Sequence, residues 1–91
     1  MSEARYRLHA DLLFTALEGE GVVLHLGERR YFTVNDTGLT LLEATREPQT
    51  FDAMVEALMK EYEVSREVAA ETTRKFLDQC LAATVMIEER E

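Results

Sequence analysis

The fold is decided by residues 22–36, whose sequence is VVLHLGERRYFTVND. Val22, Leu24 and Leu26 alternate with Val23 and His25, which is typical of a half-buried β-strand. Gly27-Glu28, with Arg29 beside it, can close a hairpin onto 30–34, a segment rich in β-branched and aromatic residues. After Asn35 the spacing of apolar residues becomes helical. This stretch therefore predicts a β-hairpin that leads directly into a helix.

The flanking segments extend this pattern on both sides. Residues 13–17 indicate a further strand, and the turn at 18–21 joins it to the hairpin as a three-stranded meander. A first helix is expected from Asn35 or Asp36 to about Arg46, where Glu47-Pro48-Gln49 ends it. Thr50 and Ser65 are expected to cap a second and a third helix. Residues 85–87 suggest a short extended segment, followed by a frayed acidic tail from Glu88.

Three strands followed by three helices predict an α+β fold in which the helices cover one face of the sheet. The second and third helices, joined at Glu63-Val64, resemble a helix–turn–helix, so the set of parts is winged-helix-like. At 91 residues and 10.4 kDa the chain is expected to form a single domain, 1–91, with its core at about 10–87.

The charge balance excludes several partners. Ten basic and eighteen acidic residues give a net charge of −8, which argues against binding to nucleic acid or to an anionic membrane surface. The single cysteine, Cys80, cannot form an internal disulfide, and no apolar run is typical of a membrane span or a signal peptide. A cytoplasmic protein is the expectation.

No residue pattern predicts catalysis, a cofactor or a metal. His9 and His25 lie sixteen residues apart and far from Cys80, so a metal site lacks its usual ligand spacing. We expect His25 to point to solvent and Cys80 to pack as a small apolar residue. The acidic residues follow solvent-facing positions, and the Gly19-Glu20-Gly21 sequence lacks the rest of a phosphate-binding loop. The chain is therefore not expected to be an enzyme.

Four of the ten basic residues gather on two of the expected elements. Arg29 and Arg30 belong to the third strand, and Arg74 and Lys75 belong to the third helix. If these elements face one another, their junction is a neutral-to-positive groove on an acidic protein. The alternative is that these residues pair with acidic neighbours.

The order and spacing of these segments resemble the PqqD-like family. Residues 23–38 resemble its hairpin, its aromatic strand of the "RYF-x-L-N-x-x-G" kind and its first helix. Residues 50–58 resemble its second helix, 61–64 its "Y-x-V" link, and 74–81 its third helix. The resemblance covers about residues 10–87. It implies a domain that binds the leader of a ribosomally synthesised precursor peptide and delivers it to a leader peptidase or another modifying enzyme.

The resemblance also implies how the leader is bound. It would add as a strand beside the third strand, in the cleft with the third helix, by β-augmentation. Carried over by position, the peptide-binding residues are Arg29, Arg30, Tyr31, Phe32, Thr33, Val34, Thr73, Arg74, Leu77, Asp78 and Leu81. Arg30, Arg74 and Lys75 are expected to attract acidic leader side chains. Leu77 is expected to line a pocket and Phe32 to belong to the core. Thr73, Cys80 and Thr84 depart from the family's usual residues, which puts the shape of the pocket in question.

Three functions remain open at this stage. The lasso-peptide pathway is favoured, in which such a domain works beside a separate leader peptidase and a cyclase. The first alternative is a peptide chaperone for a radical SAM enzyme in pyrroloquinoline quinone biosynthesis. The second is a winged-helix transcription regulator, which the net charge of −8 opposes.

Overall fold

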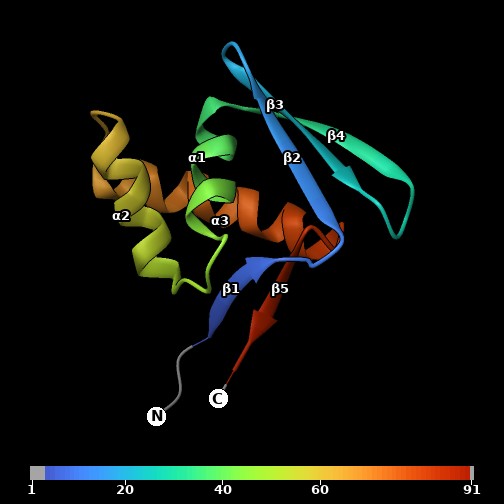
Figure 1. Cartoon of the computed structure of the whole chain (residues 1–91). Coiled ribbons are helices and arrows are strands. Elements are labelled where there is room, and N and C mark those ends of the chain that lie inside the picture. Colours follow the sequence, from blue (N-terminus) through green and yellow to red (C-terminus); the bar gives the residue numbers. More distant parts are fainter. Residues whose placement is uncertain (1–3, 91) are drawn as a thin grey trace.

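The computed structural model describes residues 4–90 of the chain. Figure 1 shows its elements, which in chain order are β1 (Arg5–Leu8), β2 (Leu12–Leu17), β3 (Glu20–His25), β4 (Arg30–Asn35), α1 (Asp36–Ala44), α2 (Phe51–Glu61), α3 (Arg66–Ala82) and β5 (Met86–Glu89). β2, β3 and β4 form an antiparallel sheet in that order, and three helices follow it. The predicted α+β, winged-helix-like fold is thereby confirmed.

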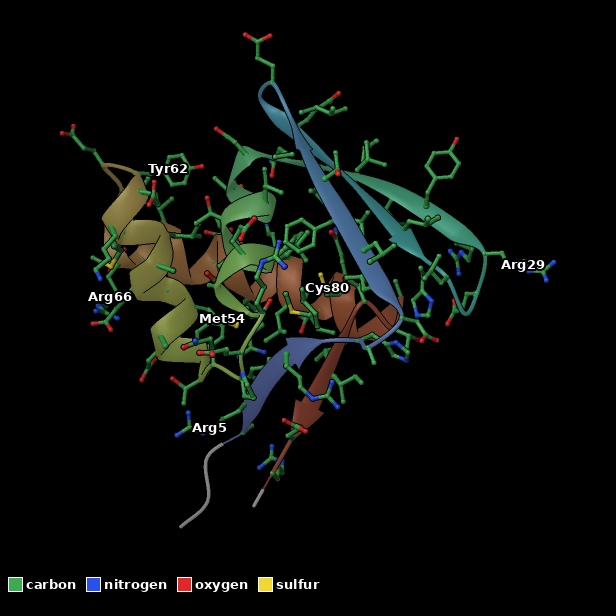
Figure 2. The ribbon with its side chains drawn as sticks, viewed as in Figure 1. Arg5, Arg29, Met54, Tyr62, Arg66 and Cys80 are labelled. Atoms are coloured by element: carbon green, nitrogen blue, oxygen red, sulfur yellow. The ribbon has the colours of Figure 1, made fainter. Side chains whose placement is uncertain are left out.

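The turns of this sheet place two residues in the left-handed region. Gly19, in the turn between β2 and β3, has a φ of 77°, which glycine adopts without a steric penalty. Arg29, at the tip of the β3–β4 hairpin, has a φ of 54° although it carries a side chain. Figure 2 shows the Arg29 side chain projecting from this tip, away from the body of the protein.

The face of the sheet that packs on the helices is the one that carries Val23 and His25. Val23 lies opposite Phe14 on β2 and Phe32 on β4, and these three side chains belong to or pack against the core. The expectation that His25 points to solvent is wrong, because only 2% of its surface is exposed. Its Nδ1 accepts a hydrogen bond from the Glu28 N–H at 3.2 Å, and its ring lies 4.7 Å from that of His9. Leu24 and Leu26 are consequently turned outward.

A second, two-stranded sheet joins the two ends of the chain. β1 pairs antiparallel with β5, and Arg7 Nε lies 3.0 Å from Glu89 Oε2 across the pair. Tyr6 on β1 is buried, and its backbone exchanges hydrogen bonds of 2.8 and 2.9 Å with Gln49. Glu88 and Glu89 therefore belong to a strand, and the prediction of a frayed tail from Glu88 is wrong. The extended segment expected at 85–87 corresponds to β5.

Each helix begins at the cap that the sequence predicted. The side chains of Asn35, Thr50 and Ser65 accept hydrogen bonds from backbone N–H groups three residues later. α1 ends at Ala44, two residues earlier than expected, and the Thr45 hydroxyl donates to the carbonyls of Leu41 and Leu42 at 2.9 and 3.2 Å. The core lies among the helices and the inner sheet face, and its largest fully buried side chains are Leu41, Leu42, Met54, Leu58, Leu77 and Met86.

Candidate functional site: the groove between β4 and α3

The outer edge of β4 is open. In the described part of the chain β4 pairs with β3 alone, and Figure 1 shows it at the far side of the sheet from β2. Such an edge presents unpaired N–H and C=O groups that can pair with another extended chain. Phe32 and Val34 pack against the core on one face of the strand, whereas Tyr31 is 74% exposed on the other face.

A groove with two compartments follows the inner face of β4, where the strand meets α3. The apolar compartment, about 110 Å³, is lined by Val23, Phe32, Phe76, Cys80, Ala83 and Val85. The polar compartment, about 350 Å³, is lined by Asn35, Thr37, Thr72 and Lys75. Both compartments are also lined by Thr33, Val34 and Gln79, and Phe76 borders the polar one as well. They are therefore neighbouring parts of one groove.

The polar compartment lies beside the first turn of α1. Asn35, the last residue of β4, accepts hydrogen bonds from the Gly38 N–H and the Thr37 hydroxyl, each at 3.0 Å. A Cβ atom on Gly38 would come within 2.9 Å of Phe76 Cε1 and 3.1 Å of Val34 Cβ. The absence of a side chain at Gly38 thus allows the start of α1 to pack closely against residues from both sides of the groove.

Cys80 contributes a neutral surface to the apolar compartment. Burial raises the pKa of its thiol from 9.0 to about 12, because the thiolate would lose its hydration. Figure 2 shows Cys80 on α3, within the body of the protein. The groove therefore presents a protonated thiol, rather than a nucleophilic thiolate, at neutral pH.

This burial predicts a loss of stability in alkali. The thiol ionises near pH 9 in the unfolded chain and near pH 12 in the folded chain, so its burial stabilises the fold fully below pH 9 and progressively less up to pH 12. Between pH 9 and 11 the free energy of unfolding should therefore fall faster with pH in the wild type than in Cys80→Ala. The two slopes should differ by about 1.4 kcal/mol per pH unit. Denaturant titrations at each pH measure both slopes, and parallel slopes would contradict the prediction.

The basic residues near the groove are paired with acidic neighbours. Arg30 Nη1 lies 3.6 Å from Glu28, Arg74 Nη1 lies 3.7 Å from Asp78, and Lys75 Nζ lies 3.3 Å from Glu71. The Arg30 guanidinium also stacks 5.2 Å from the Phe32 ring centre, and that of Arg74 stacks 4.4 Å from Phe51 on α2. All three ion pairs are exposed, so each contributes ~0.2–1 kcal/mol. Lys75 lines the polar compartment, whereas Arg74 lines neither compartment.

The structure places the predicted strand residues at the open edge. Phe32, Thr33 and Val34 line the groove, Arg30 begins the strand, and Tyr31 lies on the outer face of the sheet. Arg29 lies in the hairpin turn before the strand.

The predicted helix residues lie beside the groove rather than in it. Leu77 and Thr73 are both 0% exposed, so the expectation that Leu77 lines a surface pocket is wrong. The Thr73 side chain is buried in the core, and among the described residues its hydroxyl has no hydrogen-bond partner. Arg74, Asp78 and Leu81 line neither compartment.

The groove is bordered instead by the adjacent face of α3. Thr72, Phe76, Gln79 and Ala83 follow one another at intervals of three or four residues, which is the spacing of one helix face. At about 100° per residue, Arg74, Asp78 and Leu81 lie on the opposite flank of the buried Thr73 and Leu77 from these groove residues. This spacing is visible in the sequence, where Phe76 belongs to the broad less polar stripe of the helix and Gln79 carries no distinguishing signal.

The described residues hold no cluster of three or more His, Cys, Asp and Glu side chains that could bind a metal ion. Within 4–90, no helix is both long and apolar enough to cross a membrane.

The sequence of the chain matches a known family over most of its length. Residues 20–85 match the family described as coenzyme PQQ synthesis protein D (PqqD). The chain belongs to the PqqD family. The matched segment begins with β3 and includes β4, all three helices and the residues that border both compartments of the groove. The predicted family resemblance is thereby confirmed. No curated protein sequence matches the chain.

Two solved structures share the PqqD-family fold of this chain. The first, TbiB1 in complex with the TbiA(beta) leader peptide, has a TM-score of 0.77 at 22% sequence identity and covers 88% of this chain and 93% of that one. The second, a lasso peptide synthetase B1 complexed with the leader peptide, has a TM-score of 0.74 at 18% identity and covers 90% and 96% respectively. At these identities the likeness establishes the fold.

Proposed function

We propose that this PqqD-family chain binds the leader segment of a ribosomally synthesised precursor peptide and presents it to a maturation enzyme. The leader pairs with the open edge of β4, and every second side chain enters the groove beside α3. The chain itself supplies recognition and no catalytic group. The enzyme that receives the leader is a leader peptidase or another modifying enzyme, and binding takes place in the cytoplasm.

The observation that carries this proposal is the combination of an unpaired strand edge with a continuous groove beneath it. Main-chain hydrogen bonds along β4 supply affinity for any extended peptide, while the two compartments distinguish between side chains. Two proteins of the same fold were solved with leader peptides bound, which supports the assignment of the occupant. The description of one of them names a lasso peptide synthetase, which favours a lasso precursor.

One alternative has support of its own. The family description names coenzyme PQQ synthesis, which favours a chaperone that delivers a peptide to a radical SAM enzyme. Both candidates use the same edge and groove, so the identity of the precursor decides between them. A transcription regulator is less favoured, because α3 carries three basic and three acidic residues in a chain of net charge −8.

The test is a calorimetric titration of the purified chain with synthetic leaders. The peptides are the leader of the precursor encoded in the neighbouring reading frames, the same residues in scrambled order, and a precursor peptide of pyrroloquinoline quinone biosynthesis. We expect the first to bind at least about tenfold more tightly than the scrambled peptide. Equal affinity for the native and scrambled leaders would overturn the proposal, and preference for the pyrroloquinoline quinone precursor would favour the alternative. A DNA duplex titrated at low salt tests the regulator.

A further inference from the structure

The polar compartment has an unusual charge for this protein. The chain has eighteen acidic and ten basic residues, yet the eight described residues that line this compartment include Lys75 and no acidic side chain. The start of α1 lies beside it, where Asp36 offsets the partial positive charge that the first turn of a helix carries. Among the side chains that line the compartment, the one formal charge is therefore the positive charge of Lys75.

The pairing of Lys75 leaves it able to bind a ligand. Its Nζ lies 3.3 Å from Glu71 on the preceding helical turn, and both side chains are about 70% exposed, at 73% and 69%. An exposed pair of this kind is weak, so a carboxylate that arrives in the groove can share or replace it. The other basic residues nearby are held differently, since Arg74 stacks on Phe51 and Arg30 stacks on Phe32.

The spacing of the two compartments sets the spacing of the leader side chains. Phe32 borders the apolar compartment and Val34 borders both, and these two residues lie two positions apart on the same face of β4. Two residues of a strand span about 6.6 Å, and side chains on one face recur with that period. A strand paired with β4 therefore places residues i and i+2 in the two neighbouring compartments.

The direction of the leader gives the order of these two residues. Every strand pair of the main sheet is antiparallel. A leader that continues this arrangement meets Val34 before Phe32, so its residue in the polar compartment precedes its residue in the apolar compartment.

We propose that Lys75 is a specificity-determining residue that selects an aspartate or glutamate in the leader, two residues before an aliphatic side chain that enters the apolar compartment. The inference rests on the proposed function and adds the class of leader that the groove accepts. The recognised sequence is thus acidic-x-aliphatic, read from the N-terminus of the leader.

A charge-swap experiment tests this assignment. Each acidic residue of the native leader is changed in turn to glutamine and to lysine, and each peptide is titrated against the wild type, Lys75→Met and Lys75→Glu. We expect one acidic position of the leader at which the change to glutamine weakens binding to the wild type about three- to tenfold. The same change should leave the affinity for Lys75→Met unaltered. The lysine peptide for that position should bind Lys75→Glu better than it binds the wild type.

The matched control is Lys60→Glu, which makes the same change in net charge on α2, outside both compartments. An equal loss of leader affinity in Lys60→Glu and Lys75→Glu would overturn the inference, as would the absence of coupling between Lys75 and every acidic position of the leader. In either case, leader binding by the wild type would still support the proposed function. Failure of the wild type to bind any leader would overturn both.

Discussion

Leu77→Ala should lower the free energy of unfolding by about 2–5 kcal/mol, because it removes a fully buried side chain from the centre of α3 and leaves a cavity. Any fraction of the variant that remains folded should bind the leader with nearly the affinity of the wild type, since Leu77 lines neither compartment of the groove. Denaturant unfolding gives the first quantity, and a leader titration under conditions that keep the variant folded gives the second.

Phe32→Ala is the comparison that gives this result its meaning. Phe32 is half-buried on an edge strand and borders the apolar compartment, so its ring is available to an incoming side chain. We expect a loss of at least ~2 kcal/mol in leader binding, about thirtyfold in Kd, with a smaller loss of stability than in Leu77→Ala. The opposite ranking, in which Leu77→Ala loses more affinity and Phe32→Ala more stability, would restore the interpretation made from the sequence.

The sequence predicted the main sheet and the helices because their signals are local. Alternation along β3, the aromatic and β-branched run of β4, and side-chain caps at Asn35, Thr50 and Ser65 all act within a few residues. The pairing of β1 with β5 has no such signal. Each strand has four residues, and the register joins Arg5 to Glu89 near the opposite end of the chain. A short strand whose partner is so distant is stabilised by tertiary contacts that a local pattern does not contain.

The orientation of β3 was less predictable than its existence. Val22, Leu24 and Leu26 occupy one face of the strand, and Val23 and His25 occupy the other. Both faces therefore carry apolar residues. Period-2 alternation then identifies a strand without deciding which face is buried. The register with Phe14 and Phe32 decides it: His25 is buried, its Nδ1 accepts the Glu28 N–H, and its Nε2 has no hydrogen-bond partner among the described residues.

A similar ambiguity explains the error on α3. Its less polar stripe is broad and includes Ala69, Thr72, Thr73, Phe76, Leu77, Cys80 and Leu81. Neighbouring positions on a helix are separated by about 100°, so a stripe of this width does not determine which of its sides meets the sheet. In the structure Thr73 and Leu77 face the interior, and Phe76 and Gln79 line the groove. Of the residues named from the sequence, Phe32, Thr33 and Val34 therefore border the groove, whereas those of α3 lie in the interior or on its opposite flank.

Thr33→Pro should reduce leader affinity by at least about tenfold, because proline removes one N–H donor and its ring obstructs the close approach of a paired strand. Thr33 lies in the middle of β4 and borders both compartments, so a leader that uses either one passes this residue. Calorimetric titration with the native leader measures the affinity, and circular dichroism with a thermal melt establishes that the variant is folded.

Ala16→Pro is the matched control for this variant, on the opposite edge of the sheet. A residue of the central strand points its N–H and C=O toward one neighbour, and successive residues point to opposite neighbours. Thr33 lies opposite Val22 and Ala16 lies opposite Gly21, the adjacent residue of β3, so Thr33 and Ala16 have the same hydrogen-bonding relation to the central strand. The two prolines should therefore disturb the sheet similarly, while Thr33→Pro alone blocks the leader. Equal affinity losses in the two variants would mean that binding depends on the sheet as a whole, and a larger loss in Ala16→Pro would move the docking edge to β2.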